Sequence, residues 1–169
     1  MKFYTTDEAE WLKEEIVNRR LECPIDMIIA DAREIQEACN GVGAEWLSTT
    51  SRKIITKMLH YAEASAAVHD WQYHHSNGDA LRREHVDDLF LNNGLREVRS
   101  KYPQWWNWRR WLGERAVLAA HEVLRRVGDK AWNDALAKRF LRVCDERGMT
   151  PDDFFNKQLN ESENDEINT

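Results

Sequence analysis

Residues 67–73 read Ala-Val-His-Asp-Trp-Gln-Tyr and lie inside the stretch from Cys39 to Phe90 around which the chain is organised. Apolar residues recur at helical spacing before them, so we predict one long helix over about residues 50–75. Tyr73 follows His69 by four positions and therefore shares its face of the helix. His69 and Asp70 point about 100° apart. They can therefore serve two neighbouring centres, but not one small ion.

A cluster of turn-forming residues, Ser76-Asn77-Gly78-Asp79, follows this helix, and the next apolar helical pattern covers about residues 79–101. If the two helices turn back on each other within this cluster, His69 and Asp87 lie level, because both helices rise equally per residue. A carboxylate in that place fixes the tautomer of a histidine and stabilises its protonated form. Asp88, the next residue, points elsewhere.

A glycine-containing turn follows Cys39, with Gly41 and Gly43 separated by one residue. Glycine allows positive φ and close approach of the backbone to a ligand. Successive carbonyls of such a turn can converge on Ca²⁺, which takes six to eight oxygen ligands. The carboxylate of Asp70 can complete that set. By itself this motif is weak evidence for a cation site, and it gains weight from the His-Asp pair.

Three spaced motifs together resemble the phospholipase A2 superfamily, and more closely small phospholipase A2-like proteins of bacterial and prophage genomes. They are Asn40-Gly41-x-Gly43, His69-Asp70-x-x-Tyr73 and Arg83-x-x-x-Asp87-x-x-Phe90. The likeness covers about residues 39–95, which we take as the phospholipase A2-like core.

This resemblance implies Ca²⁺-dependent hydrolysis of a phospholipid or other acyl ester. His69 would be the general base acting on a water molecule, oriented by Asp87, and Tyr73 would hydrogen-bond to Asp87. Ca²⁺ would be bound by the Asp70 carboxylate and loop carbonyls, and one loop N–H would be an oxyanion donor. The carbonyls are those of Cys39, Gly41 and Gly43, and the N–H is that of Gly41.

The chain departs from the secreted members of that superfamily in two respects. Their cysteines flank the histidine, whereas Val68 and Trp71 occupy this neighbourhood here. The insert between the glycine turn and His69, residues 44–68, is also longer than theirs.

Two other functions compete with ester hydrolysis. The first is a non-catalytic phage or prophage protein that uses the same scaffold for structure or interaction. The second, which we favour less, is a metal-dependent phosphohydrolase of the His-Asp type. That class needs a further histidine well upstream, but His60 lies only nine positions before His69.

Composition predicts one folded domain. The chain has 169 residues, 42% of them hydrophobic, with eight Trp. We assign residues 1–159 to a single all-α bundle, built around the antiparallel hairpin of helices 50–75 and 79–101, and residues 160–169 to a disordered acidic tail. The net charge of −6 gives no reason to expect a nucleic acid partner. Oligomeric state is left open.

Cysteine usage and the N-terminus indicate a location. Cys23, Cys39 and Cys144 are too few and too widely spaced for a disulfide framework, so we expect reduced thiols. The N-terminus lacks the apolar run of a secretion signal, and no segment has about 18 consecutive apolar residues. We expect a soluble cytoplasmic protein, unless a phage or a lysis event releases it.

Local signals predict the remaining helices. Thr5 begins a capping box for a first helix with Trp11, Leu12 and Ile16 on its apolar face. Further helices are expected over residues 24–38, 103–128 and 130–147, and a short one from Thr150 to Leu159.

Residues 105–111 read Trp-Trp-Asn-Trp-Arg-Arg-Trp and allow two interpretations. They form either an interfacial membrane face or a packing layer from which the arginines extend to water. Because tryptophan is highly buried on average, we predict the packing layer.

Overall fold

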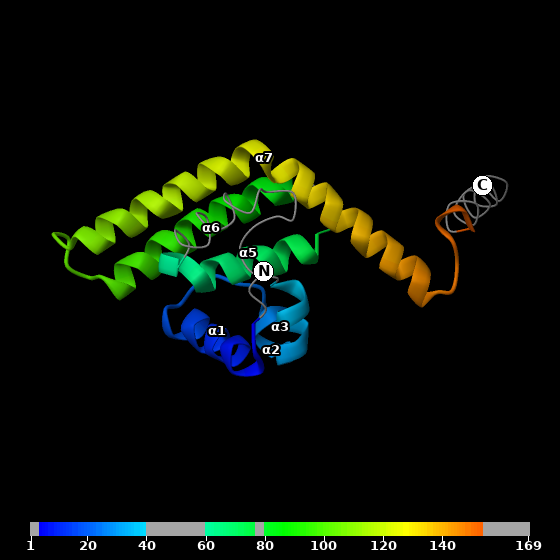
Figure 1. The fold of residues 1–169 in the computed structure, drawn as a ribbon, viewed down its shortest axis with the longest axis horizontal. Coiled ribbons are helices and arrows are strands. Elements are labelled where there is room, and N and C mark those ends of the chain that lie inside the picture. Colours follow the sequence, from blue (N-terminus) through cyan, green and yellow to red (C-terminus); the bar gives the residue numbers. More distant parts are fainter. Residues whose placement is uncertain (1–3, 40–59, 77–79, 154–169) are drawn as a thin grey trace, which may run out of the picture.

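The computed structural model describes residues 4–39, 60–76 and 80–153. Over these residues every regular element is helical, so the predicted all-α fold is confirmed. Figure 1 shows α5, α6 and α7 lying along one another, with α1 and α3 packed against α5 and α2 beside α3. Five parts of the sequence interpretation fall outside the described residues. They are the glycine turn, residues 50–59 of the 50–75 helix, most of the 76–79 turn, the short helix beyond residue 153 and the 160–169 tail.

Helix α1, Thr6–Asn18, begins at the predicted capping box. The Thr5 hydroxyl accepts from the Glu8 backbone N–H at 3.3 Å, and the Glu8 carboxylate accepts from the Thr5 N–H at 2.8 Å. Leu12 and Ile16 are buried as expected, but Trp11 is 38% exposed. Since Trp11 lies about 100° around the helix from Leu12, it cannot share the inward face.

The predicted helix over residues 24–38 is wrong, because the structure divides it into α2, Ile25–Ile29, and α3, Ala32–Ala38. Asp31 caps α3, accepting from the Glu34 N–H at 2.8 Å, and Glu34 accepts from the Asp31 N–H at 3.1 Å. Asp31 itself has the extended backbone conformation of an N-cap residue, so the helix before it cannot continue through it. The break turns the chain so that Met27 and Ile35 both enter the core.

The prediction of one continuous helix over residues 50–75 is wrong, because a 3₁₀ turn, η1, at His60–Ala62 precedes helix α5, Glu63–His74. Helix α6 covers Ala80–Lys101. The contacts of α5 with α6 run in opposite directions along the two helices: Ser65 bonds to Glu97, whereas Tyr73 bonds to Asp87. The two helices are therefore antiparallel where they touch. Ser65 and Ala66 of α5 are small and buried on the side of α6, which allows the two helices to approach closely, whereas Ala64 and Ala67 pack with residues of the N-terminal helices.

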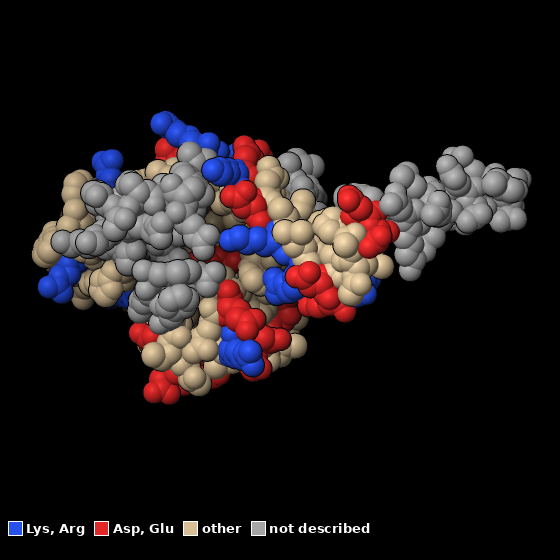
Figure 2. Space-filling view, turned by 45° about the vertical axis from the view of Figure 1, so that its right-hand side comes forward, with Lys and Arg blue, Asp and Glu red and all other residues tan. Residues whose placement is uncertain are grey.

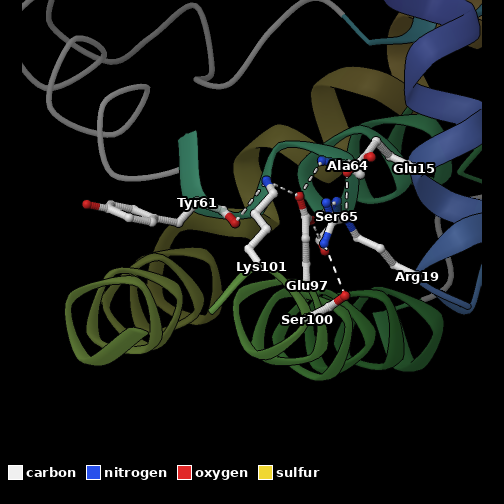
Figure 3. A network of polar contacts seen from close by, with 8 residues as sticks. All are labelled: Glu15, Arg19, Tyr61, Ala64, Ser65, Glu97, Ser100 and Lys101. Carbon is white, nitrogen blue, oxygen red and sulfur yellow. Dashed lines mark hydrogen bonds and ion pairs between the residues drawn. The ribbon is translucent and has the colours of Figure 1, made fainter. Parts of the chain in front are cut away.

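The first turn of α5 is capped by a side chain of α6, because its own N-cap residue, Ala62, provides no side-chain hydrogen bond. Glu97 is fully buried and accepts from the Ser65 N–H at 2.9 Å and from its hydroxyl at 2.7 Å. Lys101 donates to the same carboxylate at 2.8 Å (Figure 3). A carboxylate at a helix N-terminus satisfies free N–H groups and the helix dipole. Glu97 thus fixes where α5 begins relative to α6.

The predicted helices over residues 103–128 and 130–147 are in fact one helix, α7, Trp108–Glu146. It begins at Asn107, whose side chain accepts from the Arg109 N–H at 2.9 Å. Gly128 does not end it, and Figure 1 shows α7 bending in its middle. After the bend, α7 contacts the end of α5, where Arg139 donates to the carbonyl of His75 at 3.0 Å.

Two glycines set the spacing of α6 and α7. A Cβ atom added at Gly94 of α6 would lie 2.8 Å from Val117, and one added at Gly113 of α7 would lie 2.8 Å from Val98. Each glycine therefore receives a valine of the facing helix. Close packing, and not a kink or a turn, accounts for both.

The packing layer predicted for the tryptophans of residues 105–111 is wrong. Trp105, Trp106, Trp108 and Trp111 are 79%, 70%, 62% and 57% exposed. Because α7 turns its small residues toward α6, its large side chains near residue 108 face away from the core.

The C-terminal part begins as the sequence predicts. Gly148, with φ of 62°, follows α7, and the Thr150 hydroxyl then accepts from the Asp153 N–H at 3.2 Å. Residues beyond 153, including the rest of the predicted short helix, lie outside the described residues.

Charges of both signs are interspersed on the face shown in Figure 2, where Lys and Arg side chains lie among Asp and Glu side chains. Among the described residues, none of the helices is both long and apolar enough to cross a membrane.

Candidate functional site

The predicted dyad is formed where the middle of α5 meets α6. The Nε2 atom of His69 lies 3.1 Å from Oδ1 of Asp87. Both side chains are inside the protein: Asp87 has no exposed surface and His69 is 7% exposed. The structure therefore brings together the imidazole and the carboxylate that the sequence places level with each other.

Asp87 accepts two further hydrogen bonds. Tyr73 donates to Oδ1 at 2.7 Å, and Arg83 donates to Oδ2 at 2.9 Å. Burial raises the pKa of the Asp87 carboxyl, but interactions with His69, Tyr73 and Arg83 outweigh burial and leave this pKa below its usual value. Asp87 is consequently an anion held in one orientation by three donors.

Ring contacts fix the plane of the His69 imidazole. Its centroid lies 4.2 Å from that of Tyr73 and 5.6 Å from that of Phe90, whose ring it meets edge-on. Because the carboxylate of Asp87 can only accept, we assign the Nε2–H tautomer, which leaves a lone pair on Nδ1. Burial lowers the pKa of His69, but Asp70 and Asp87 outweigh burial and leave this pKa raised. The imidazole is thus a strengthened base with a defined basic atom.

Asp70 lies on the other side of the imidazole. Its Oδ1 is 3.7 Å from Nδ1 of His69, beyond hydrogen-bond distance, and 30% of its side chain is exposed. Burial raises the pKa of this carboxyl, and the charge of His69 only partly offsets the rise. A partly buried carboxylate without a strong donor among the described residues is stabilised by a cation. Asp70 therefore fits the role of a cation ligand.

The start of the predicted calcium loop lies beside α5. Cys39 is fully buried, and its thiol donates to the carbonyl of Ala67 at 3.3 Å. Burial, followed by the charge of Asp70, raises the pKa of this thiol. Gly41 and Gly43 lie outside the described residues. Only the first residue of the predicted loop is therefore placed, and it lies close to the aspartate predicted to share its cation.

The described residues contain no group of three or more His, Cys, Asp or Glu side chains that could hold a metal ion.

Two residues of the network were missed as functional candidates. Arg83 was given no role, although a basic residue four positions before Asp87 indicates an ion pair on one helix face. Gly128 of α7 lies over the network, where an added Cβ atom would be 2.7 Å from the Tyr73 hydroxyl and 2.9 Å from Nη1 of Arg83. No sequence signal separates such a packing glycine from one that ends a helix.

Other histidines lie outside this network. His121 contacts Asp88 at 3.1 Å on the surface, so Asp88 points away from His69 as predicted. His74 lines a cavity with His75, Arg139, Arg142, Val143 and Glu146 near the end of α5. Burial and the positive charge of Arg142 lower the pKa of His74 to about 4. That cavity contains none of the predicted site residues.

Comparison of the chain with protein-family models, curated proteins and solved structures gives no match. The geometry around His69 is therefore the basis for a functional proposal.

Proposed function

We propose that this protein is a hydrolase that uses His69 to activate water against an ester, by resemblance the acyl ester of a phospholipid. One observation carries the proposal: the Asp87 carboxylate lies 3.1 Å from Nε2 of His69, while Nδ1 lies on the other side of the ring, 3.7 Å from Asp70, whose side chain is 30% exposed. An oriented base with a carboxylate behind it is the arrangement that general-base catalysis needs.

In this mechanism a water molecule attacks the ester carbonyl and gives its proton to Nδ1 of His69. The positive charge that develops on the imidazole is stabilised by Asp87, which three donors hold in place. The proton then passes from Nδ1 to the leaving alkoxide. Neither a serine nor a cysteine nucleophile is required.

Asp70 would hold Ca²⁺ together with the carbonyls of Cys39, Gly41 and Gly43. When bound, Ca²⁺ supplies a Lewis acid that stabilises negative charge on the carbonyl oxygen. The N–H of Gly41 would donate to the same oxygen. The parts played by the two glycines rest on the resemblance, whereas that of Asp70 also rests on its position beside His69.

The burial of His69, which is 7% exposed, favours a second function. A buried histidine with a buried carboxylate also serves as a structural polar pair, as a non-catalytic interaction protein of phage or prophage origin would use it. The two functions differ in one measurable property, because only a hydrolase needs a proton acceptor at Nδ1.

We also infer a cytoplasmic location. Cys23, Cys39 and Cys144 are free thiols, as a reducing compartment maintains them.

The first experiment measures fatty acid release from phospholipid vesicles in millimolar Ca²⁺. His69→Ala and His69→Gln should each lower the rate roughly 10²-fold or more, the usual contribution of a general base. Glutamine can still donate to Asp87, so it preserves the buried contact while removing the base. His121→Gln is the matched control, since His121 lies at the same 3.1 Å from an aspartate but on the surface. Equal rates in His69→Gln and His121→Gln would exclude His69 as the base.

The second experiment is a thermal melt with and without millimolar Ca²⁺. At 100 times its Kd, Ca²⁺ adds about 2.7 kcal/mol to the stability of a protein that binds it only when folded. The wild type should therefore melt at a higher temperature with Ca²⁺, and Asp70→Ala should not respond. An unchanged wild-type melt would remove the cation from the mechanism.

A further inference from the structure

The four exposed tryptophans lie together at one end of the molecule. Trp105 and Trp106 occupy the connection between α6 and α7, and Trp108 and Trp111 follow in the first turn of α7. Figure 1 shows this connection projecting at the end opposite to the one toward which α7 extends. We call Trp105, Trp106, Trp108, Trp111 and the neighbouring arginines 109 and 115 the tryptophan surface.

Helix geometry directs this surface away from the core. Trp108, Trp111 and Arg115 are spaced by three and four residues and so form one stripe along α7. Gly113 and Val117, which pack on α6, each follow a residue of that stripe by two positions, about 200° around the helix. Burying the inward face against α6 therefore exposes the tryptophans.

Basic side chains accompany the tryptophan rings. The guanidinium of Arg109 lies 5.5 Å from the ring centroid of Trp108, and that of Arg115 lies 5.4 Å from that of Trp111. Residues 99–115 contain five Lys or Arg and one acidic residue, Glu114, in a chain of net charge −6. Glu114 is already paired with Arg99 and Arg110. This end of the molecule is therefore locally positive, although the whole chain is negative.

We propose that the tryptophan surface binds the surface of an anionic phospholipid membrane. Indole rings are favoured at the boundary between hydrocarbon and headgroups, because they combine a large apolar body with one N–H donor. Arginine next to them matches the phosphates of anionic lipids in charge and in hydrogen-bond geometry. The charge of this end selects an anionic surface over a neutral one.

This surface does not depend on the proposed hydrolase. Membrane binding needs the tryptophans and arginines at the end of α6 and the start of α7, whereas hydrolysis needs His69 and Asp87. Each proposal can therefore be refuted without the other. If vesicle binding is unchanged in His69→Gln but lost in a tryptophan variant, the binding is due to the tryptophan surface and not to the proposed hydrolase site.

The test is co-sedimentation with vesicles of phosphatidylcholine, alone or mixed with phosphatidylglycerol. The wild type should sediment with the mixed vesicles and be released by salt. Arg109→Gln with Arg115→Gln should weaken this binding, roughly fivefold for each arginine removed. Replacing the four tryptophans of the surface by serine should lower it at least tenfold, the step that ~1.4 kcal/mol represents.

A double variant on α2, Ile25→Ser with Ile29→Ser, is the control. These side chains are 74% and 77% exposed, so it removes apolar surface elsewhere on the molecule, and its binding should equal that of the wild type. Three results would overturn the proposal. In the first, the wild type does not sediment with vesicles. In the second, the tryptophan variant binds as well as the wild type. In the third, the wild type is a dimer and the tryptophan variant a monomer, and neither binds vesicles. The last would assign the surface to a second copy of the chain.

Discussion

Replacing Asp87 with asparagine tests whether the buried carboxylate holds α5 and α6 together. The change keeps the size of the side chain and one acceptor oxygen, but it removes the negative charge and directs an N–H₂ group at a donor. In the native protein Arg83 donates to Oδ2 at 2.9 Å, and Arg83 is itself only 6% exposed. The variant therefore leaves a buried guanidinium facing a second donor.

The expected cost is about 3 kcal/mol, the lower end of the range for removing one partner of a buried ion pair. The lower end applies because Arg83 keeps a second partner, Asp129, at 2.9 Å. Asp129 is 72% exposed, so water weakens this remaining ion pair and it does not replace Asp87 in full. With a urea slope of about 2 kcal/mol per molar, such a loss lowers the unfolding midpoint by about 1.5 M.

The pH dependence of this cost has a definite sign. The pKa of Asp87 is lowered in the folded protein, so its stabilisation is complete above the unfolded value of about 3.9 and is lost as the pH falls toward the folded value. The difference between wild type and Asp87→Asn should therefore shrink between pH 5 and pH 3.

Urea unfolding at neutral and acidic pH measures this cost, with Asp88→Asn as the control. Asp88 is adjacent but 59% exposed and paired with His121 on the surface, so its replacement should cost under about 1 kcal/mol. If the two asparagine variants unfold at the same urea concentration, or if the Asp87 difference is as large at pH 3 as at pH 5, the buried charge is not what joins the helices.

Two further predictions concern helix packing. Glu97→Gln should destabilise the protein by about 2–3 kcal/mol in urea unfolding, because it removes the buried carboxylate that caps α5 and pairs with Lys101. Glu114→Gln, on a partly exposed carboxylate, should cost under about 1 kcal/mol. Similar losses in the two variants would contradict the capping role. Gly128→Ala adds helix propensity worth about 1 kcal/mol, yet its Cβ would displace the Tyr73 hydroxyl, so we expect a net loss of stability, and a higher melting temperature would show that the network has room to yield.

Several features of the fold could be predicted because they depend on neighbouring residues. The capping box at Thr5 and the N-cap at Thr150 each join residues three positions apart, and both form. The meeting of His69 with Asp87 needed one assumption about where the chain turns and the uniform rise of a helix, and the pair lies in contact.

The errors arise where tertiary packing reverses a local signal. Asp31 begins a new helix inside an apolar pattern that looked continuous, whereas Gly128 continues one that looked finished. Both an aspartate and a glycine can stand either inside a helix or at its end, so residue type alone does not decide. Packing of α7 against α5 and α6 bears on Gly128, since a Cβ atom there would lie 2.7 Å from the Tyr73 hydroxyl and 2.9 Å from Nη1 of Arg83, and these side chains would have to shift.

The sequence by itself determined the helical class, the first helix and the pairing of an imidazole with an aspartate, because periodicity, caps and helical rise act over a few residues. Only the tertiary structure decided that Glu97 caps α5, that glycines of α6 and α7 receive valines, and that the tryptophans of residues 105–111 face outward. These outcomes depend on which faces of distant helices meet. Which faces meet is decided by the apolar area that the whole chain buries and by how closely it packs. No local sequence pattern contains that information.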